Sequence, residues 1–173
     1  FAFEDLTEAD APQMLALATL TEPGPFLEAT HQLGAFVGIK QDGRLVAMAG
    51  DRMRPDGFTE VSGVCTHPDH RGRGLAGKLM RVVAGRITAR GETPFLHAYA
   101  SNTGTIGLYE SLGFVTRREV TATVLATRYG SIPMSIKRVN ELAASLVCSV
   151  LKTRWPVSAD WMAISAVSRS RIS

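Results

Sequence analysis

The apolar residues in the first two thirds of the chain recur at two spacings, which predict strands alternating with helices. Short apolar runs at 35–39, 44–49 and 58–66 predict three strands, with a hairpin turn at Asp42-Gly43 between the first two. At 75–90 an apolar residue stands at every third or fourth position, which is typical of a helix. We expect the three strands to form an antiparallel meander that leads directly into this long helix.

The same two spacings continue on either side of this segment. Thr7 opens a capping box, which predicts a first helix that Pro23 and Pro25 bring to an end. Residues 95–100 predict a further strand, which should run parallel to the third strand because the long helix between them is a crossover connection. Asn102 is a favoured N-cap residue and predicts the start of another helix.

The last third of the chain is expected to differ from the part before it. Residues 114–127 alternate loosely and leave clear room for only one strand. A helical stripe of apolar residues follows between Pro133 and Lys152. We therefore divide the chain into a domain at 1–127 and a helical extension at 128–173. The extension is interpreted either as an apolar cover or homodimer contact, or as a foreign sequence that is apolar by chance.

The junction between the third strand and the long helix has the character of an anion site. It consists of Arg71, Gly72, Arg73 and Gly74, after which the helix begins at Leu75. The first amides of a helix lack intrahelical partners, and the helix dipole adds partial positive charge there. The glycines lack the Cβ atoms that would keep a phosphate from the backbone, and the arginines add fork-shaped cations. The segment predicts a pyrophosphate site, and it matches neither the nucleoside-triphosphatase loop nor the dinucleotide fingerprint.

The charge distribution and the cysteine content limit the classes of binding partner and the cellular compartment that we expect. Residues 1–127 hold 12 Lys and Arg against 14 Asp and Glu, whereas 128–173 hold 7 against 2, so the basic balance comes from the tail alone. Residues 1–127 lack the basic, aromatic-interleaved patch of a nucleic-acid-binding protein, and the sequence has no apolar run long enough to span a membrane. Cys65 and Cys148 lack metal-ligand spacing and are interpreted as free thiols of a cytoplasmic protein. Because residue 1 is Phe rather than Met, we expect the N-terminus to be truncated or processed.

Two motifs resemble those of the GNAT superfamily of acyl-CoA-dependent N-acetyltransferases. The first is Arg-x-x-Gly-x-Ala, formed by Arg71, Gly74 and Ala76. The second is Asn-x(6)-Tyr-x-x-x-Gly-Phe, formed by Asn102, Tyr109, Gly113 and Phe114. The resemblance covers about residues 7–127. It implies an α/β (α+β) fold with a mixed, mostly antiparallel central sheet flanked by helices, in which a parallel strand pair splays apart to bind CoA. It also implies acetyl-CoA as the acyl donor, with no metal.

The resemblance assigns roles to residues around the pyrophosphate site. It implies a bulge near the end of the third strand, where the backbone pairs with the pantetheine arm of CoA. One N–H group there can also donate to the thioester oxygen as negative charge develops on it. The implied CoA contacts are Val64, Cys65, Thr66, Arg71, Gly72, Arg73, Gly74, Leu75, Ala76 and Asn102.

Tyr109 and Glu60 are the expected catalytic residues. The phenol of Tyr109 stays protonated at neutral pH and can protonate the departing thiolate, the alternative being a tyrosine that only packs. Glu60 can take a proton from the incoming ammonium, directly or through water, the alternative being an exposed rim residue. His97 is a second candidate base or substrate contact, weighed against a structural histidine. By the resemblance, Phe26 and Glu28 are candidate substrate contacts, weighed against core packing and solvation.

The expected reaction is the transfer of an acetyl group from acetyl-CoA to a primary amine by direct attack in a ternary complex. A covalent intermediate on Cys65 is disfavoured, because only His67 lies close enough in sequence to activate the thiol. The mildly acidic domain favours a small cationic amine, such as an aminoglycoside or a polyamine. The alternatives are a protein or amino-acid acceptor, a non-catalytic acyl-CoA sensor, and an assembly protein that acts through the tail.

Overall fold

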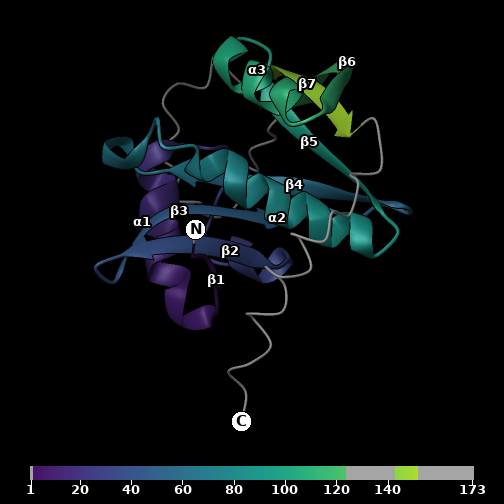
Figure 1. Ribbon diagram of the computed structural model, residues 1–173. Helices are drawn as coiled ribbons and strands as arrows, with labels where there is room; N and C mark the ends of the chain where they lie inside the picture. The colour runs from purple at the N-terminus through teal and green to yellow at the C-terminus, as the bar shows by residue number, and fades with distance from the viewer. Residues whose placement is uncertain (1, 124–142, 152–173) are drawn as a thin grey trace, which may run out of the picture.

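The computed structural model describes residues 2–123 and 143–151, and within them seven strands form one mixed sheet (Figure 1). The strands stand in the order β1-β2-β3-β4-β5-β7-β6, and every neighbouring pair is antiparallel except β4 and β5. The strands are β1 (Glu4–Asp5), β2 (Phe36–Gln41), β3 (Arg44–Asp51), β4 (Phe58–Thr66), β5 (Thr93–Tyr99), β6 (Phe114–Thr123) and β7 (Ala143–Leu151). The helical segments are η1 (Glu8–Asp10), α1 (Ala11–Thr21), η2 (Thr30–Leu33), η3 (Pro68–His70), α2 (Leu75–Ala89) and α3 (Thr103–Ser111).

Local sequence accounts for the first half of this order. Asp42 and Gly43 have φ angles of 49° and 75°, so they form the left-handed turn that an Asp-Gly pair predicts between β2 and β3. Thr7 donates its backbone N–H to Asp10 Oδ2 at 2.8 Å, which closes the predicted capping box ahead of α1. The predicted meander of β2, β3 and β4 and the long helix α2 are confirmed.

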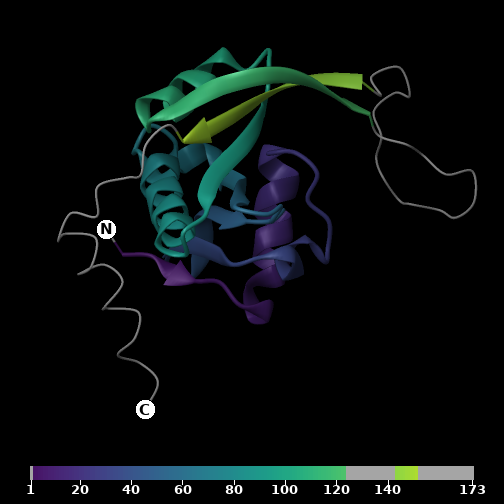
Figure 2. The same ribbon diagram turned by 90° about the vertical axis from the view of Figure 1, so that its right-hand side faces the viewer.

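The sheet is covered by α2 on one face and by α1 on the other, as Figure 2 shows. Each helix buries its own apolar cluster against the strands between them. The α2 cluster includes Val61, Leu79, Ile87 and Leu96. The α1 cluster includes Met14, Leu17, Phe36 and Cys65. Val64 and Cys65 are successive residues of β4 and therefore point to opposite faces, so β4 contributes to both clusters.

β4 and β5 lie side by side only at one end. Their parallel register ends with the pair Glu60 and Phe95, and the described residues form no further pair between the two strands. Beyond this point the strands diverge, which confirms the predicted splayed pair. The carboxyl-terminal halves of β4 and β5 therefore face a gap instead of each other.

β4 also contains the irregularity that was predicted near the end of the third strand. Ser62 pairs with Gly50 of β3 and Cys65 pairs with Met48, so two residues of β4 oppose one residue of β3. The first residue of this bulge is Gly63, whose φ of 61° suits glycine. The bulge takes a short stretch of β4 out of the regular ladder directly beside the gap.

The sheet includes a strand from the tail, which the apolar spacing does not predict. β7 lies between β5 and β6 and pairs antiparallel with both, so the helical prediction is wrong for 143–151. A short apolar run fits a strand as well as one face of a helix. The spacing of apolar residues does not reveal that β5 has an unpaired edge with which a further strand can pair. β6 is the single strand predicted within 114–127. The rest of the extension, with the pattern interpreted as a cover or homodimer contact, lies outside the described residues.

Replacing Gly50 in β3 by alanine is expected to destabilise the fold, because the added Cβ would lie 2.4 Å from Cδ1 of the Phe36 ring. Displacing a buried ring in a close-packed core costs about 1–3 kcal/mol. Gly85→Ala in α2 is the matched control, since its Cβ would meet nothing within 4 Å. It should raise the free energy of unfolding by about 0.5–1 kcal/mol. Urea unfolding of both variants measures the difference, and equal stabilities would contradict this packing.

Candidate active site

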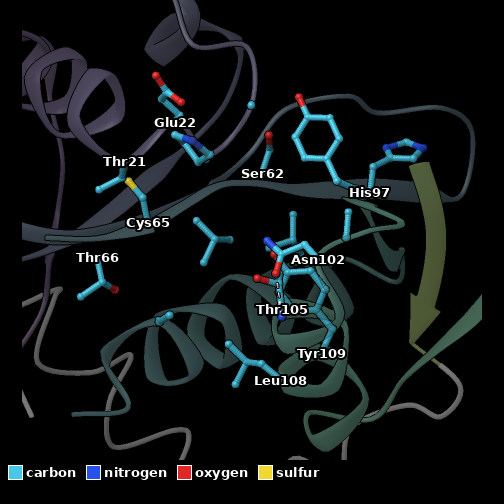
Figure 3. A pocket seen from close by; sticks show the side chains of 18 of the residues that line it. Thr21, Glu22, Ser62, Cys65, Thr66, His97, Asn102, Thr105, Leu108 and Tyr109 are labelled. Carbon is cyan, nitrogen blue, oxygen red and sulfur yellow. Dashed lines mark hydrogen bonds between the residues drawn. The ribbon is translucent and has the colours of Figure 1, made fainter. Parts of the chain in front are cut away.

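The gap between β4 and β5 opens into a cavity of about 960 Å³. One side of it, here called the α3 side, carries Asn102, Thr105, Leu108 and Tyr109 around α3 (Figure 3). The opposite side, here called the α1 side, is formed by the loop at 22–26 that follows α1 and by residues of β4 and β5. The two sides of the cavity therefore carry different side chains.

The predicted anion site borders the α3 side. Gly74 is the N-cap of α2 with a φ of 70°, Gly72 has a φ of 75°, and a Cβ on either would meet no atom within 4 Å. Arg71 lines the cavity and donates from Nε to the Thr66 carbonyl oxygen at 3.4 Å. Arg73 does not line the cavity, and its Nη1 lies 3.4 Å from His70 Nδ1 at the surface. The loop therefore presents bare backbone and one arginine to the cavity.

The remaining predicted CoA contacts also line the wall of the cavity. Leu75, Ala76 and Asn102 line the cavity, and Asn102 also accepts the Thr105 N–H at 3.1 Å, which confirms its predicted role as an N-cap. The end of β4 contributes Val64, Cys65 and Thr66.

Thr66 contributes a buried hydroxyl to this wall. Its Oγ1 has no hydrogen-bond partner among the described residues. A buried polar atom without a partner costs about 1–3 kcal/mol. The bulge beside it also frees backbone groups from pairing with β3. This stretch of wall therefore fits a ligand that brings polar groups of its own.

The Cys65 side chain packs into the α1 cluster. Burial raises the pKa of its thiol to about 11, and a hydrogen bond with Thr21 offsets only part of this. Little thiolate is present at neutral pH, so Cys65 is a poor nucleophile. The side chain of Cys148 lies outside the described residues.

Tyr109 lies two turns into α3 and borders the α3 side of the cavity (Figure 3). Its ring packs against the α2 cluster and beside Phe114, with the ring centroids 6.3 Å apart. Burial raises the pKa of Tyr109 to about 12. Its hydroxyl has no hydrogen-bond partner within 2–123 and 143–151. The phenol is thus protonated at neutral pH and available to a ligand.

Three side chains meet where β4 and β5 separate. Glu60 Oε2 accepts the Arg52 Nε–H at 3.0 Å, and Glu60 Oε1 lies 2.9 Å from His97 Nδ1. Glu60 is only 2% exposed, so it is not a rim residue. Burial alone would raise the pKa of the Glu60 carboxyl, but the hydrogen bonds from His97 and Arg52 outweigh it and hold the pKa below its usual value. Glu60 is a buried carboxylate that stays ionised.

The two predicted substrate contacts in the loop after α1 have different positions. Phe26 lines the cavity and meets the Phe36 ring edge-on, with the centroids 5.8 Å apart. Glu28 is exposed and does not line the cavity, because it lies in a turn closed by the Thr30 N–H donating to Leu27 O at 3.0 Å.

Arg52 is a site residue that the sequence interpretation missed. It lies just after β3, where its backbone N–H donates to the Glu60 carbonyl oxygen at 3.1 Å. The predicted antiparallel pairing of the two strands could have revealed it, because the register of β3 with β4 brings Arg52 opposite Glu60. Glu22 and Ser62 also line the cavity without having been predicted.

The described residues contain no group of three or more His, Cys, Asp or Glu side chains placed to hold a metal ion. Among the helices of the described segments, none combines the length and apolar content that crossing a bilayer requires.

Comparison with known proteins connects this geometry to a family. A family model described as FR47-like protein matches residues 36–124, just over half of the chain. A solved structure from Novosphingobium aromaticivorans, assigned to the GNAT acetyltransferase family, is 45% identical with a TM-score of 0.66. The match covers 87% of this chain but 57% of that protein, so this chain spans little more than half of its length. No curated protein matches the sequence.

Two more distant structures share the fold. The ribosomal-protein-S18-alanine N-acetyltransferase of Escherichia coli has a TM-score of 0.67 at 20% identity, over 87% of this chain and 92% of that one. A GNAT acetyltransferase of Elizabethkingia anophelis, solved with acetyl-CoA bound, has a TM-score of 0.67 at 16% identity, over 88% and 97%. The motifs, the splayed strands and the match to the family model agree, and this chain belongs to the FR47-like family within the GNAT superfamily of acetyltransferases.

Proposed function

We propose that this protein transfers an acetyl group from acetyl-CoA to a primary amine by direct attack in a ternary complex. The observation that carries the proposal is a single cavity lined by a glycine-bounded helix N-terminus, the protonated phenol of Tyr109 and the buried carboxylate of Glu60. The reaction needs such a set: an anion site for the pyrophosphate, an acid for the leaving thiolate, and a proton acceptor for the amine.

The α3 side has the groups that would hold CoA. The amides at Gly72, Gly74 and the first turn of α2 would bind the pyrophosphate, with Arg71 as a counter-charge. The free backbone groups at the bulge and the Thr66 hydroxyl would pair with the amides of the pantetheine arm, which gives a partner to a buried atom that lacks one. When bound, acetyl-CoA supplies the acetyl group as an activated thioester.

The chemistry moves protons at the acceptor nitrogen and at the departing sulfur. The amine nitrogen attacks the thioester carbonyl carbon, so a C–N bond forms as the C–S bond breaks. Tyr109 donates its phenolic proton to the departing sulfur, and a base on the α1 side takes one proton from the amine. A backbone N–H of the bulge stabilises the negative charge that develops on the carbonyl oxygen. The buried, largely protonated thiol of Cys65 favours this direct route over an acyl-enzyme.

The acceptor that the α1 side favours is a small cationic amine, such as a polyamine or an aminoglycoside. Arg52 is neutralised by Glu60, whereas Glu22 is exposed and forms no ion pair among the described residues. The net charge of this side is therefore negative, which attracts an ammonium group.

A protein N-terminus is the second candidate acceptor. Met53 and Tyr99 line the same cavity and leave 45% and 44% of their surfaces exposed. Exposed apolar side chains at the mouth of a cavity suit a peptide segment.

Use of acetyl-CoA and the free thiol of Cys65 support a cytoplasmic location, which belongs to the same proposal.

Calorimetry with CoA and a thiol-release assay with acetyl-CoA test the proposal. We expect CoA to bind and thiol release to depend on added amine, across a panel of polyamines, aminoglycosides, amino acids and peptides. Release with peptides alone would select the protein acceptor. Binding without turnover on any amine would identify an acyl-CoA sensor instead, and a folded protein that does not bind CoA would overturn the assignment.

A further inference from the structure

The proposed reaction needs a group that accepts a proton from the attacking amine, and two side chains on the α1 side are candidates. We infer that His97 is this base, through its Nε2 atom, and that Glu60 is a positioning residue that acts through His97. The inference rests on the proposed function and names the group that carries out one of its steps.

Both oxygens of Glu60 already have partners. Oε2 accepts from Arg52 Nε at 3.0 Å, and Oε1 lies 2.9 Å from His97 Nδ1 and 3.4 Å from Arg52 Nη2. Only 3% of the Glu60 side chain is exposed. Two donors also make the carboxylate a weaker base, because they hold its pKa below the usual value despite its burial. An amine in the cavity would have to displace a partner in order to reach Glu60.

His97 is better placed to meet an amine. It lines the cavity with 26% of its side chain exposed, and its ring rests edge-on against Phe95, with the centroids 5.6 Å apart. Because a carboxylate can only accept, Nδ1 must donate to Glu60, and the neutral ring then carries its lone pair on Nε2. Nε2 has no hydrogen-bond partner among the described residues. The pair thus presents one accessible, correctly oriented lone pair to the cavity.

Arg52 completes the arrangement from the other side. It holds Glu60 ionised and in place, and its Nη1 donates to the Pro25 carbonyl oxygen at 3.4 Å. This contact ties the loop that borders the α1 side to the same carboxylate. His97 is therefore held in place through the start of β4, the end of β3 and the loop at 22–26.

The step balances in protons and charge. Nε2 takes one proton from the bound ammonium, which frees the lone pair that attacks, and the resulting imidazolium is stabilised by the Glu60 carboxylate. The second proton that the nitrogen loses as the amide forms replaces the proton that Tyr109 gives to the sulfur. Other titratable and charged side chains also line the same cavity: Glu22, Arg52, Cys65, His70, Arg71, Tyr99 and Tyr109. On the neighbouring strand β7, the residue paired with His97 is Cys148, whose side chain lies outside the described residues.

Kinetics of two variants separate the base from its positioning residue. His97→Asn keeps an N–H that can donate to Glu60 but has no lone-pair nitrogen, so kcat/KM should fall about 10²–10⁴-fold. In this variant kcat/KM should no longer fall on the acid side of the pH profile, and the affinity for CoA should equal that of the parent protein. Glu60→Gln should lose less rate than His97→Asn, because the ring keeps its lone-pair nitrogen and loses only the carboxylate that fixes its orientation.

The control is His31→Asn, because His31 lies outside the cavity and contacts Glu8 instead. Its rate should equal that of the parent protein. A loss in Glu60→Gln that matches or exceeds the loss in His97→Asn would make Glu60 the base and overturn the inference.

A second measurement does not require turnover. Nitrogen-15 NMR of the folded protein at mildly alkaline pH should show the His97 ring protonated at Nδ1 and bare at Nε2, and Glu60→Gln should weaken this preference. A ring protonated at Nε2 would overturn the inference even if no amine is acetylated. Failure of the whole amine panel, with the expected tautomer present, would count against the proposed function instead.

Discussion

Tyr109→Phe is expected to lower kcat for acetyl transfer about 10²–10⁴-fold, with little change in KM for acetyl-CoA. The substitution removes one hydroxyl, and the ring keeps its packing beside Phe114. The loss reflects the proton that the thiolate needs as it departs. Because burial raises the pKa of Tyr109 to about 12, ionisation of this phenol should not reduce the parent rate through the neutral and mildly alkaline range. Steady-state kinetics of the two proteins give the comparison.

Two further measurements make the Tyr109 result specific. Calorimetry with CoA and thermal unfolding should show the same binding and stability in variant and parent. An acyl donor built on a more acidic thiol should narrow the gap in kcat, because such a leaving group depends less on protonation. Equal kcat values with acetyl-CoA itself would remove Tyr109 from the mechanism.

Gly74→Asp is expected to weaken CoA binding by ~100-fold or more, which corresponds to about 2.7 kcal/mol. The new carboxylate would stand at the N-cap of α2, where the pyrophosphate is proposed to bind, and would repel it. Aspartate is among the few residues that tolerate a left-handed φ such as the 70° found here, and it is a favoured N-cap, so the fold should survive. Calorimetry with CoA measures the loss.

Gly57→Asp is the matched control for this substitution. Gly57 has a φ of 75°, its Cβ would also meet nothing within 4 Å, and it lies in the turn before β4, outside the cavity lining. Its affinity for CoA should equal that of the parent, while Gly74→Ala should show the small effect of strain without charge. Unchanged binding by Gly74→Asp would show that the pyrophosphate binds elsewhere.

The parts of the site that follow from the sequence are those with local signals. The loop at 71–74 is an example, because a strand, two glycines and a helix N-terminus follow one another closely in the chain and their geometry is set by neighbouring residues. The cap at Asn102 and the turn at Asp42-Gly43 belong to the same class. Such features depend on backbone preferences that a few residues fix.

The parts that did not follow depend on pairing between distant segments. Arg52 became visible only when the register of β3 and β4 placed it beside Glu60, and the partnership of Glu60 with His97 needed the parallel register of β5. β7 was missed for the same reason, because its apolar run fits either a strand or a helix until a free sheet edge is known. Glu28 shows the converse: closeness in sequence to Phe26 did not bring it to the cavity.

The place of β7 bears on how the molecule is completed during synthesis. β5 spans 93–99 and pairs with β4 on one edge, yet β7, the strand on its other edge, is complete only when translation has reached residue 151. Until then the nascent chain carries β5 and β6 with open edges, which are templates for unwanted association between chains. We therefore expect the chain to be most prone to association between copies before residues 143–151 have joined the sheet.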